Sequence, residues 1–166
     1  FGRRLKELPE IMTVLAELNK RIGITLLLMS KHQESLEVAR ELLRRYHFIK
    51  LLERAPDVQG LYEVIHACNV LLLHRKPANY LPVSTTVYQC LGAMRPILCP
   101  DNNFFEEFNG EVVKYRGRED LARKLVLAIT DETYIKAVLR RARAFVENRL
   151  PWKIADMLMD IAREFL

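Results

Sequence analysis

Short, continuous apolar runs alternate along this chain with longer segments of helical apolar spacing, and that alternation limits the folds it can adopt. The runs occupy residues 24–29, 48–52, 70–73, 97–99 and 112–115. Each is too short to be a helix by itself, and turn-forming residues flank them, as Gly23 and Ser30 flank the first. Between the runs, apolar residues recur three or four positions apart, as at Ile11, Val14 and Leu18. The pattern predicts strands that alternate with helices.

The predicted helices fill the segments between the strands. We expect them after Pro9, at 36–43, 61–67, 84–94, 120–149 with a break near Asp131, and 152–165, with a helical turn at 104–108. Alternating strands and helices form a parallel sheet with helices on both faces, and continuous apolar strands agree with burial on both sides. The predicted fold class is α/β, a doubly wound Rossmann-like parallel sheet. A chain of 166 residues is expected to form one domain, residues 1–166.

Charge and cysteine usage exclude several classes of function. The net charge is +5, but Lys and Arg are spread along the chain, with small clusters at 3–6 and 140–143, so no nucleic-acid partner is expected. Three cysteines (Cys68, Cys90, Cys99) without metal-ligand spacing indicate buried thiols in a reducing compartment. The four histidines form no metal-binding motif, and no metal is expected. The sequence shows neither a membrane span nor a signal peptide, so we expect a cytoplasmic protein.

Two groups of residues are candidates for binding an anion. Doubly wound sheets bind ligands at the carboxyl ends of their strands, and the long loop at 74–83 ends in Ser84, Thr85 and Thr86. These are good N-cap residues, and a helix N-terminus suits a phosphate. The alternative is that the three serve only as a cap. Arg3 and Lys6 could contact a diphosphate or form a solvated basic terminus.

Five stretches, in order, resemble the C-terminal half of retaining glycosyltransferases of the GT-B fold, the glycosyl transferases group 1 type. They are residues 1–6, 61–72, 86–98, 109–113 and 119–122. The third, TVYQCLGAMRPIL, is similar to the family signature Val-Tyr-Glu-Ala-hydrophobic-Ala-x-Gly-Lys-Pro-Val-Val. The final helices with Trp152 are similar to the family's ending, and we expect Trp152 to pack the last helix onto the domain. The resemblance covers essentially the whole chain.

The resemblance implies a domain that binds a nucleotide diphosphate sugar as donor and needs no other cofactor. Arg3 and Lys6 lie near the family's diphosphate-binding Arg and Lys. Ser84, Thr85 and Thr86 open the helix that receives the donor phosphate, and Gln89 stands where the family has a Glu that holds the ribose hydroxyls. Hexosyl transfer to an unknown acceptor would require an absent N-terminal acceptor domain of the same protein. Peripheral membrane association of the full protein is left open.

Three departures from the family pattern bear on activity. Gln89 lacks the charge of the family's Glu, and the family's earlier Glu falls on Leu81, which cannot hold a sugar hydroxyl. Residues 76–81 replace a glycine-rich loop and contain no glycine. The alternative is therefore a catalytically degenerate domain that serves as a binding or assembly module. A receiver-like domain is another doubly wound fold, but it needs an acidic cluster that the strand-end loops lack.

The resemblance also implies a strand order. The first strand of the family's sheet lies at the centre, between the second and the fourth, and Phe1 and Gly2 look like its end. We expect the natural protein to continue upstream with this strand and then with an acceptor-binding domain of similar size. A gap between residues 24–29 and 70–73 is then expected, narrowed or filled by another segment. Direct pairing of these two strands would contradict the order.

Overall fold

The computed structural model describes residues 5–54, 56–80 and 82–165. All five predicted strands are present in this part of the chain, with bounds that differ by one or two residues from the apolar runs. They are β1 (Leu26–Met29), β2 (Ile49–Leu52), β3 (Leu71–Leu72), β4 (Ile97–Pro100) and β5 (Val113–Tyr115). Phe1 and Gly2, predicted to end a further strand, lie outside the described residues.

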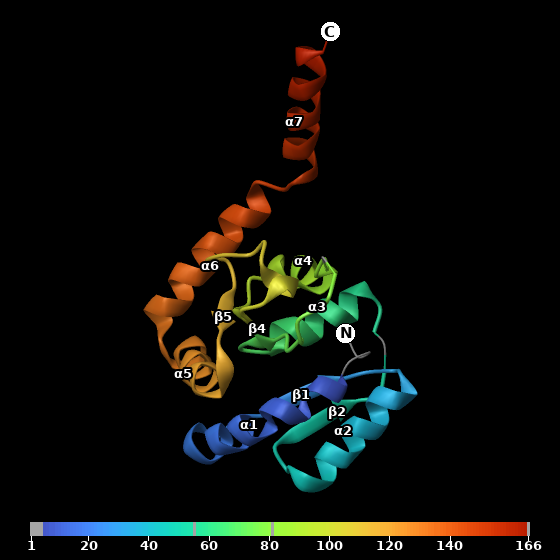
Figure 1. Ribbon diagram of the computed structural model, residues 1–166, viewed down its shortest axis with the longest axis vertical. Coiled ribbons are helices and arrows are strands. Elements are labelled where there is room, and N and C mark those ends of the chain that lie inside the picture. Colours follow the sequence, from blue (N-terminus) through green and yellow to red (C-terminus); the bar gives the residue numbers. More distant parts are fainter. Residues whose placement is uncertain (1–4, 55, 81, 166) are drawn as a thin grey trace.

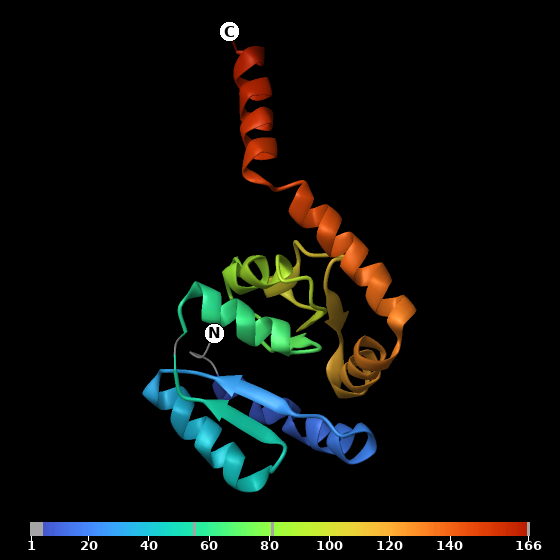
Figure 2. The ribbon, with the colours of Figure 1, turned by 180° about the vertical axis from the view of Figure 1, so that it is seen from behind.

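The described strands form two parallel sheets rather than the single predicted sheet (Figures 1 and 2). In the first, β1 pairs with β2, with Leu26 opposite Ile49. In the second, β4 lies between β3 and β5, with Leu71 opposite Ile97 and Leu98 opposite Val113. No described strand lies between β1 and β3, and the two do not pair with each other.

Helices follow the predicted order. They are α1 (Pro9–Ile22), α2 (Gln33–Arg45), α3 (Val58–Ala67), α4 (Thr85–Leu91), α5 (Gly117–Thr130), α6 (Glu132–Glu147) and α7 (Pro151–Glu164), with 3-10 turns η1 (Leu5–Glu7) and η2 (Asn103–Phe105). The predicted break at Asp131 is confirmed: its side chain accepts a 2.8 Å hydrogen bond from the N–H of Tyr134 and begins α6. Helix α4 is shorter than the predicted helix at 84–94. It ends at Leu91, and Gly92 is its C-cap residue.

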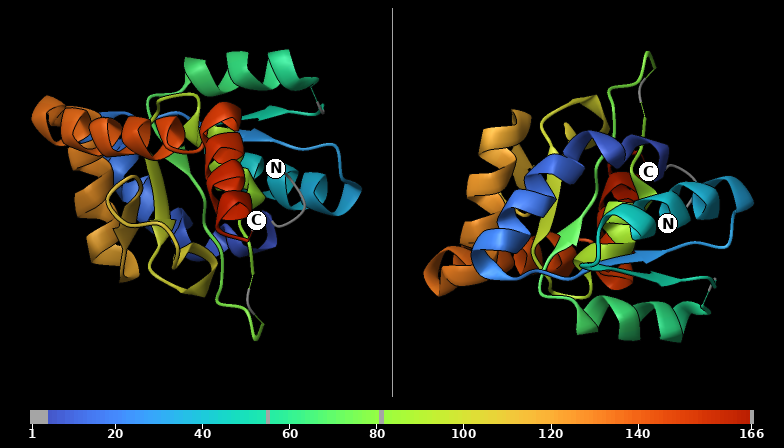
Figure 3. Two further views of the ribbon diagram at one scale, coloured as in Figure 1. Left: turned by 90° about the horizontal axis from the view of Figure 1, so that it is seen from above. Right: turned by 90° about the horizontal axis from the view of Figure 1, so that it is seen from below.

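Two apolar cores lie on opposite faces of the strands. Along β4, Leu98 belongs to the core built by α1, α2 and α5, whereas Ile97 and Cys99 belong to the core built by α3, α4 and α6. This alternation places helices on both faces, as a doubly wound fold requires. The first core also contains Leu28 of β1 and Val113 of β5, so shared helices hold the two sheets together (Figure 3).

Helix α7 projects away from the rest of the molecule (Figures 1 and 2). Leu150 is extended, and every described residue from Pro151 onward is exposed. The prediction that Trp152 packs the last helix onto the domain is wrong, because its side chain is 62% exposed. No helix in the described part of the chain is long and apolar enough to cross a membrane.

Candidate functional site

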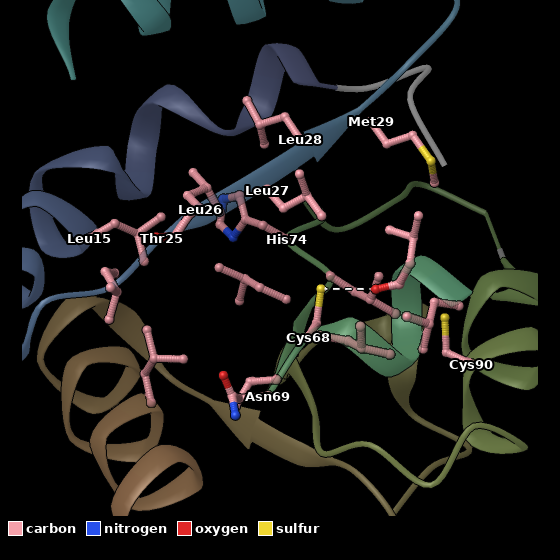
Figure 4. Close-up of a pocket in the computed structure, with 18 of the residues that line it drawn as sticks. Leu15, Thr25, Leu26, Leu27, Leu28, Met29, Cys68, Asn69, His74 and Cys90 are labelled. Carbon is pink, nitrogen blue, oxygen red and sulfur yellow. Dashed lines mark hydrogen bonds between the residues drawn. The ribbon is translucent and has the colours of Figure 1, made fainter. Parts of the chain in front are cut away.

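A cavity of about 620 Å³ opens between β1 and β3 (Figure 4). Most of its wall is apolar. Four of its polar residues lie where β3 ends and α4 begins: His74 and Arg75 follow β3, and Ser84 and Thr86 stand at the start of α4. Thr25, Lys50 and Asn69 line it elsewhere. Because ligands of doubly wound folds bind outside the carboxyl ends of the strands, this polar end of the cavity is the candidate functional site.

His74 is fixed at this end by two elements that pack against it. Its Nδ1 lies 2.6 Å from the hydroxyl of Tyr115 on β5, and its Nε2 lies 3.8 Å from a carboxylate oxygen of Glu10 on α1. Burial lowers the pKa of His74, which outweighs the opposite effect of Glu10 and Glu7. Burial also raises the pKa of Tyr115, so its hydroxyl keeps its proton. A neutral imidazole with Nε2–H towards Glu10 accepts the Tyr115 hydroxyl hydrogen at Nδ1.

The loop after β3 is tied down on both sides. The N–H of Lys76 donates to Glu7 at 2.8 Å, and the Lys76 ammonium pairs with Glu10. From the turn after β4, Asn102 donates to the carbonyl of Arg75 at 2.8 Å, and Asn103 exchanges two hydrogen bonds with the backbone of Ala78. This loop therefore has a defined shape although it contains no glycine to bring its backbone close to a ligand.

Sequence reasoning missed His74 and Arg75 as members of the site, and it missed Asn102 and Asn103 as the residues that hold the loop after β3. A usable signal existed, because these residues follow two neighbouring strands of a predicted parallel sheet. The carboxyl ends of such strands meet at one edge. That rule alone would have placed the polar side chains at both strand ends close together.

Of the residues predicted at the helix start, two line the cavity. Ser84 is the N-cap residue of α4, and its side chain makes no capping hydrogen bond. Ser84 and Thr86 both line the cavity, whereas Thr85 is exposed and is absent from its lining. The first amides of a helix have no partner within the helix. The start of α4 therefore presents both hydroxyl and N–H groups near the polar end.

The other predicted site residues do not join this cluster. Gln89 is exposed on the second turn of α4, and its backbone carbonyl accepts a 3.0 Å hydrogen bond from Tyr62. Lys6 on η1 pairs with Glu34 on α2 at 2.9 Å, and both side chains are exposed. Neither Lys6 nor Gln89 lines the cavity. Arg3 and Leu81 lie outside the described residues. Within the described ranges, no group of three or more His, Cys, Asp or Glu side chains could hold a metal ion.

Solved structures share this fold. No protein-family profile matches the sequence. Anabaena HepE (Alr3699) in complex with UDP and glucose superposes with a TM-score of 0.66 at 16% identity, covering 92% of this chain and 46% of HepE. The GtfA/B complex superposes with a TM-score of 0.69 at 12% identity, covering 95% of this chain and 33% of the other. HepE in complex with UDP-glucose gives a TM-score of 0.64 at 16% identity.

These matches and the layered architecture define the class of the fold. The chain has the α/β, Rossmann-like fold of one half of a GT-B protein. It spans less than half the length of the structures it matches.

Proposed function

We propose that this chain is the nucleotide-sugar-binding part of a glycosyltransferase and holds the diphosphate of a donor at the polar end of the cavity. One observation carries the proposal. His74, Arg75, Ser84 and Thr86 converge where a cavity opens at the carboxyl ends of the strands. The fold likeness adds support, because HepE carries UDP and glucose, or UDP-glucose, in its structures.

The proposed chemistry is electrostatic. Transfer of a sugar from a nucleotide diphosphate leaves negative charge on the departing diphosphate. Arg75, Arg3 and the amides that open α4 would stabilise that charge, as fixed donors do in a transition state. Gln89 would contact the ribose only if the nucleotide extends along α4 beyond the cavity. The acceptor would bind to a second domain of the same polypeptide.

An ion pair with Glu34 opposes a contact between Lys6 and the donor diphosphate. The Lys6 ammonium is paired with Glu34, and this pair lowers the pKa of the Glu34 carboxyl. A donor diphosphate would have to replace that carboxylate. We therefore expect Lys6→Ala to weaken donor binding and Glu34→Gln, which removes the competing charge, to strengthen it.

A degenerate binding or assembly module on the same fold is the second candidate. Its supporting observation is that Gln89, already uncharged, also lies outside the cavity lining. This candidate predicts no affinity for any nucleotide sugar.

Titration calorimetry of the full-length polypeptide distinguishes the two candidates. UDP, UDP-glucose, GDP and a GDP-linked sugar would be titrated into wild type, Lys6→Ala, Glu34→Gln and Lys20→Ala. Lys20 is a matched control, because it is an exposed lysine near the opposite end of α1. Binding of at least one nucleotide, weakened by Lys6→Ala and unchanged by Lys20→Ala, is expected. Silence across the whole set would rule out the donor-binding proposal in favour of the module.

A further inference from the structure

Helix α7 carries an apolar stripe along its length. Ile154, Leu158, Ile161 and Phe165 follow one another at intervals of four, three and four residues, which places them on one face of a helix. Their side chains are 40%, 61%, 51% and 84% exposed, and α7 has no buried residue. The described part of one copy therefore leaves the stripe largely open to solvent.

The spacing of the stripe is that of a helix that pairs with another helix. Alternation of three and four residues between apolar positions is the coiled-coil pattern, in which a seam of side chains interlocks with a second helix. If α7 of a second copy runs antiparallel, with the midpoint between residues 159 and 160, Ile154 meets Phe165 of that copy. In the same register Leu158 meets Ile161, and the twofold axis repeats both contacts. The stripe is thus complementary to itself.

Two charged residues favour the antiparallel direction. At about 100° per residue, Lys153 and Glu164 lie on the same flank of the stripe, near opposite ends of α7. In an antiparallel pair each Lys153 comes close to Glu164 of the second copy, whereas a parallel pair brings like charges together. The helix dipoles also attract each other only in the antiparallel direction. Lys153 donates a 3.2 Å hydrogen bond to the exposed Asn148, which a carboxylate can replace, and Asp160 pairs with Arg163 inside the same helix at 3.1 Å.

The position of α7 allows a second copy to approach. Leu150 is extended, and α7 projects away from both sheets (Figures 1 and 2). In an antiparallel pair the two globular parts lie at opposite ends of the helix pair, about 20 Å apart along its axis for a helix of 14 residues. The helix pair itself therefore keeps the two copies apart.

From these observations we propose that α7 is a dimerisation element that pairs in antiparallel fashion with α7 of a second copy of this chain. The shared surface is one pair of short helices, which buries less than the roughly 1,600 Å² of a standard interface. The dimer is therefore reversible and dissociates on dilution. The pairing does not depend on donor binding.

Exchange of the two charges tests the pairing on the full-length natural polypeptide. Lys153→Glu and Glu164→Lys each bring like charges together twice per dimer, so each should raise the dimer dissociation constant about tenfold in analytical ultracentrifugation. An equimolar mixture of the two variants should regain the wild-type constant, because opposite charges meet again in the mixed dimer. Asp156→Lys is the matched control, since residue 156 lies on the face opposite the stripe. A mixture that associates no better than the separate variants would overturn the proposal.

Disulfide trapping measures the direction of the pair. Under oxidising conditions, Ile154→Cys mixed with Phe165→Cys should give an interchain disulfide between the two substituted positions, as peptide mapping by mass spectrometry would show. Each variant kept apart should give little, because equal positions lie at opposite ends of an antiparallel pair. Efficient linkage within each separate variant would show a parallel pair and overturn the proposal.

Leu158→Glu tests whether the stripe is the contact. It places a charge in the middle of the stripe twice per dimer and should abolish the dimer, while the melting temperature stays unchanged because α7 has no buried residue. A wild-type monomer at every concentration, with α7 amides protected from hydrogen exchange, would assign the stripe to another part of the same polypeptide and overturn the proposal. Flotation of wild type, but not of Leu158→Glu, with anionic vesicles and without dimers would assign it to a membrane surface and overturn it equally.

Discussion

The rings of His74 and Tyr115 lie edge to edge in the candidate site, with ring centres 6.3 Å apart, ring planes 9° apart and a 2.6 Å hydrogen bond between Nδ1 and the hydroxyl. The pair joins the ends of two strands of one sheet, β3 and β5. It also keeps an uncharged imidazole against the carboxylate of Glu10 at neutral pH. That arrangement has a measurable consequence for stability.

The first prediction concerns pH. Burial lowers the pKa of His74 from its ordinary value of 6.5, whereas the unfolded chain keeps that value. The unfolded state therefore binds more protons below pH 6.5, and folding stability contributed by neutral His74 is lost as the pH falls from there. The charged groups that face the ring are Glu10, Glu7 and Lys76. As the pH is lowered from about 7.5 to about 5, the free energy of unfolding in urea should fall less for His74→Gln than for wild type.

Tyr115→Phe is the companion variant. It keeps the aromatic ring but removes the hydroxyl donor to Nδ1, and it should reduce the unfolding free energy by about 1–3 kcal/mol. Equal pH slopes for wild type and His74→Gln would contradict the assignment of the titration to His74.

The second prediction concerns the junction of α5 and α6. Asp131→Ala removes the side-chain acceptor for the N–H of Tyr134 and should destabilise the protein by about 1 kcal/mol. Asp131→Asn keeps an oxygen at the same position and should stay close to wild type. Chemical denaturation measures both. An Asn variant as unstable as the Ala variant would show that charge, not the cap, matters at this position.

The third prediction concerns Gln89. Because its side chain is exposed, Gln89→Glu should fold with a stability within about 0.5 kcal/mol of wild type. If the nucleotide reaches this position, the restored charge should keep or improve donor affinity in calorimetry. A variant that fails to fold would show instead that residue 89 is a packed structural position, and its proposed ribose contact would be withdrawn.

The fourth prediction concerns the diphosphate contact at Arg3, which follows from the sequence resemblance. Arg3→Ala should weaken donor binding by about 1.5–3 kcal/mol, the range of a hydrogen bond to a charged group. Arg3→Lys keeps the charge but not the bidentate guanidinium, so it should lose less donor affinity than Arg3→Ala. An unchanged dissociation constant in Arg3→Ala would remove Arg3 from the site.

The fifth prediction concerns the thiols. Burial raises the pKa of Cys90 and of Cys99 to about 12, and it also raises the pKa of Cys68, which is only half-buried. The thiolate is the reactive form. Iodoacetamide should modify Cys68 first in the folded chain and the other two only after unfolding, as mass spectrometry would show. Early modification of Cys99 would mean that the core around β4 opens readily.

Much of the fold could be read from the sequence because its signals are local. Continuous apolar runs marked all five strands, and the alternation of Ile97, Leu98 and Cys99 between two cores confirms that both faces are covered. The polar start of α6 at Asp131 was likewise a local signal. The buried thiols were predicted correctly for Cys90 and Cys99, but Cys68 is half-buried.

The wrong predictions concern which segments of the chain are in contact with each other. Trp152 has the apolar character of a packed residue, but periodicity shows only which face of a helix is apolar, not whether anything covers it. The described strands fall into two sheets instead of the single predicted sheet, whereas the expected gap between β1 and β3 is confirmed. In the candidate site, the sequence identified Ser84 and Thr86 but missed His74, whose role depends on Tyr115 and Glu10 from other elements.

Helix α7 carries a practical consequence. It has no buried residue, and Trp152, Met157, Leu158 and Phe165 are all more than half exposed. Exposed apolar surface of this kind promotes self-association without adding to the free energy of folding. The connection between α6 and α7 is therefore a suitable place to end the chain. A chain that stops at Leu150 should melt at the same temperature and stay monomeric at concentrations where the longer chain associates.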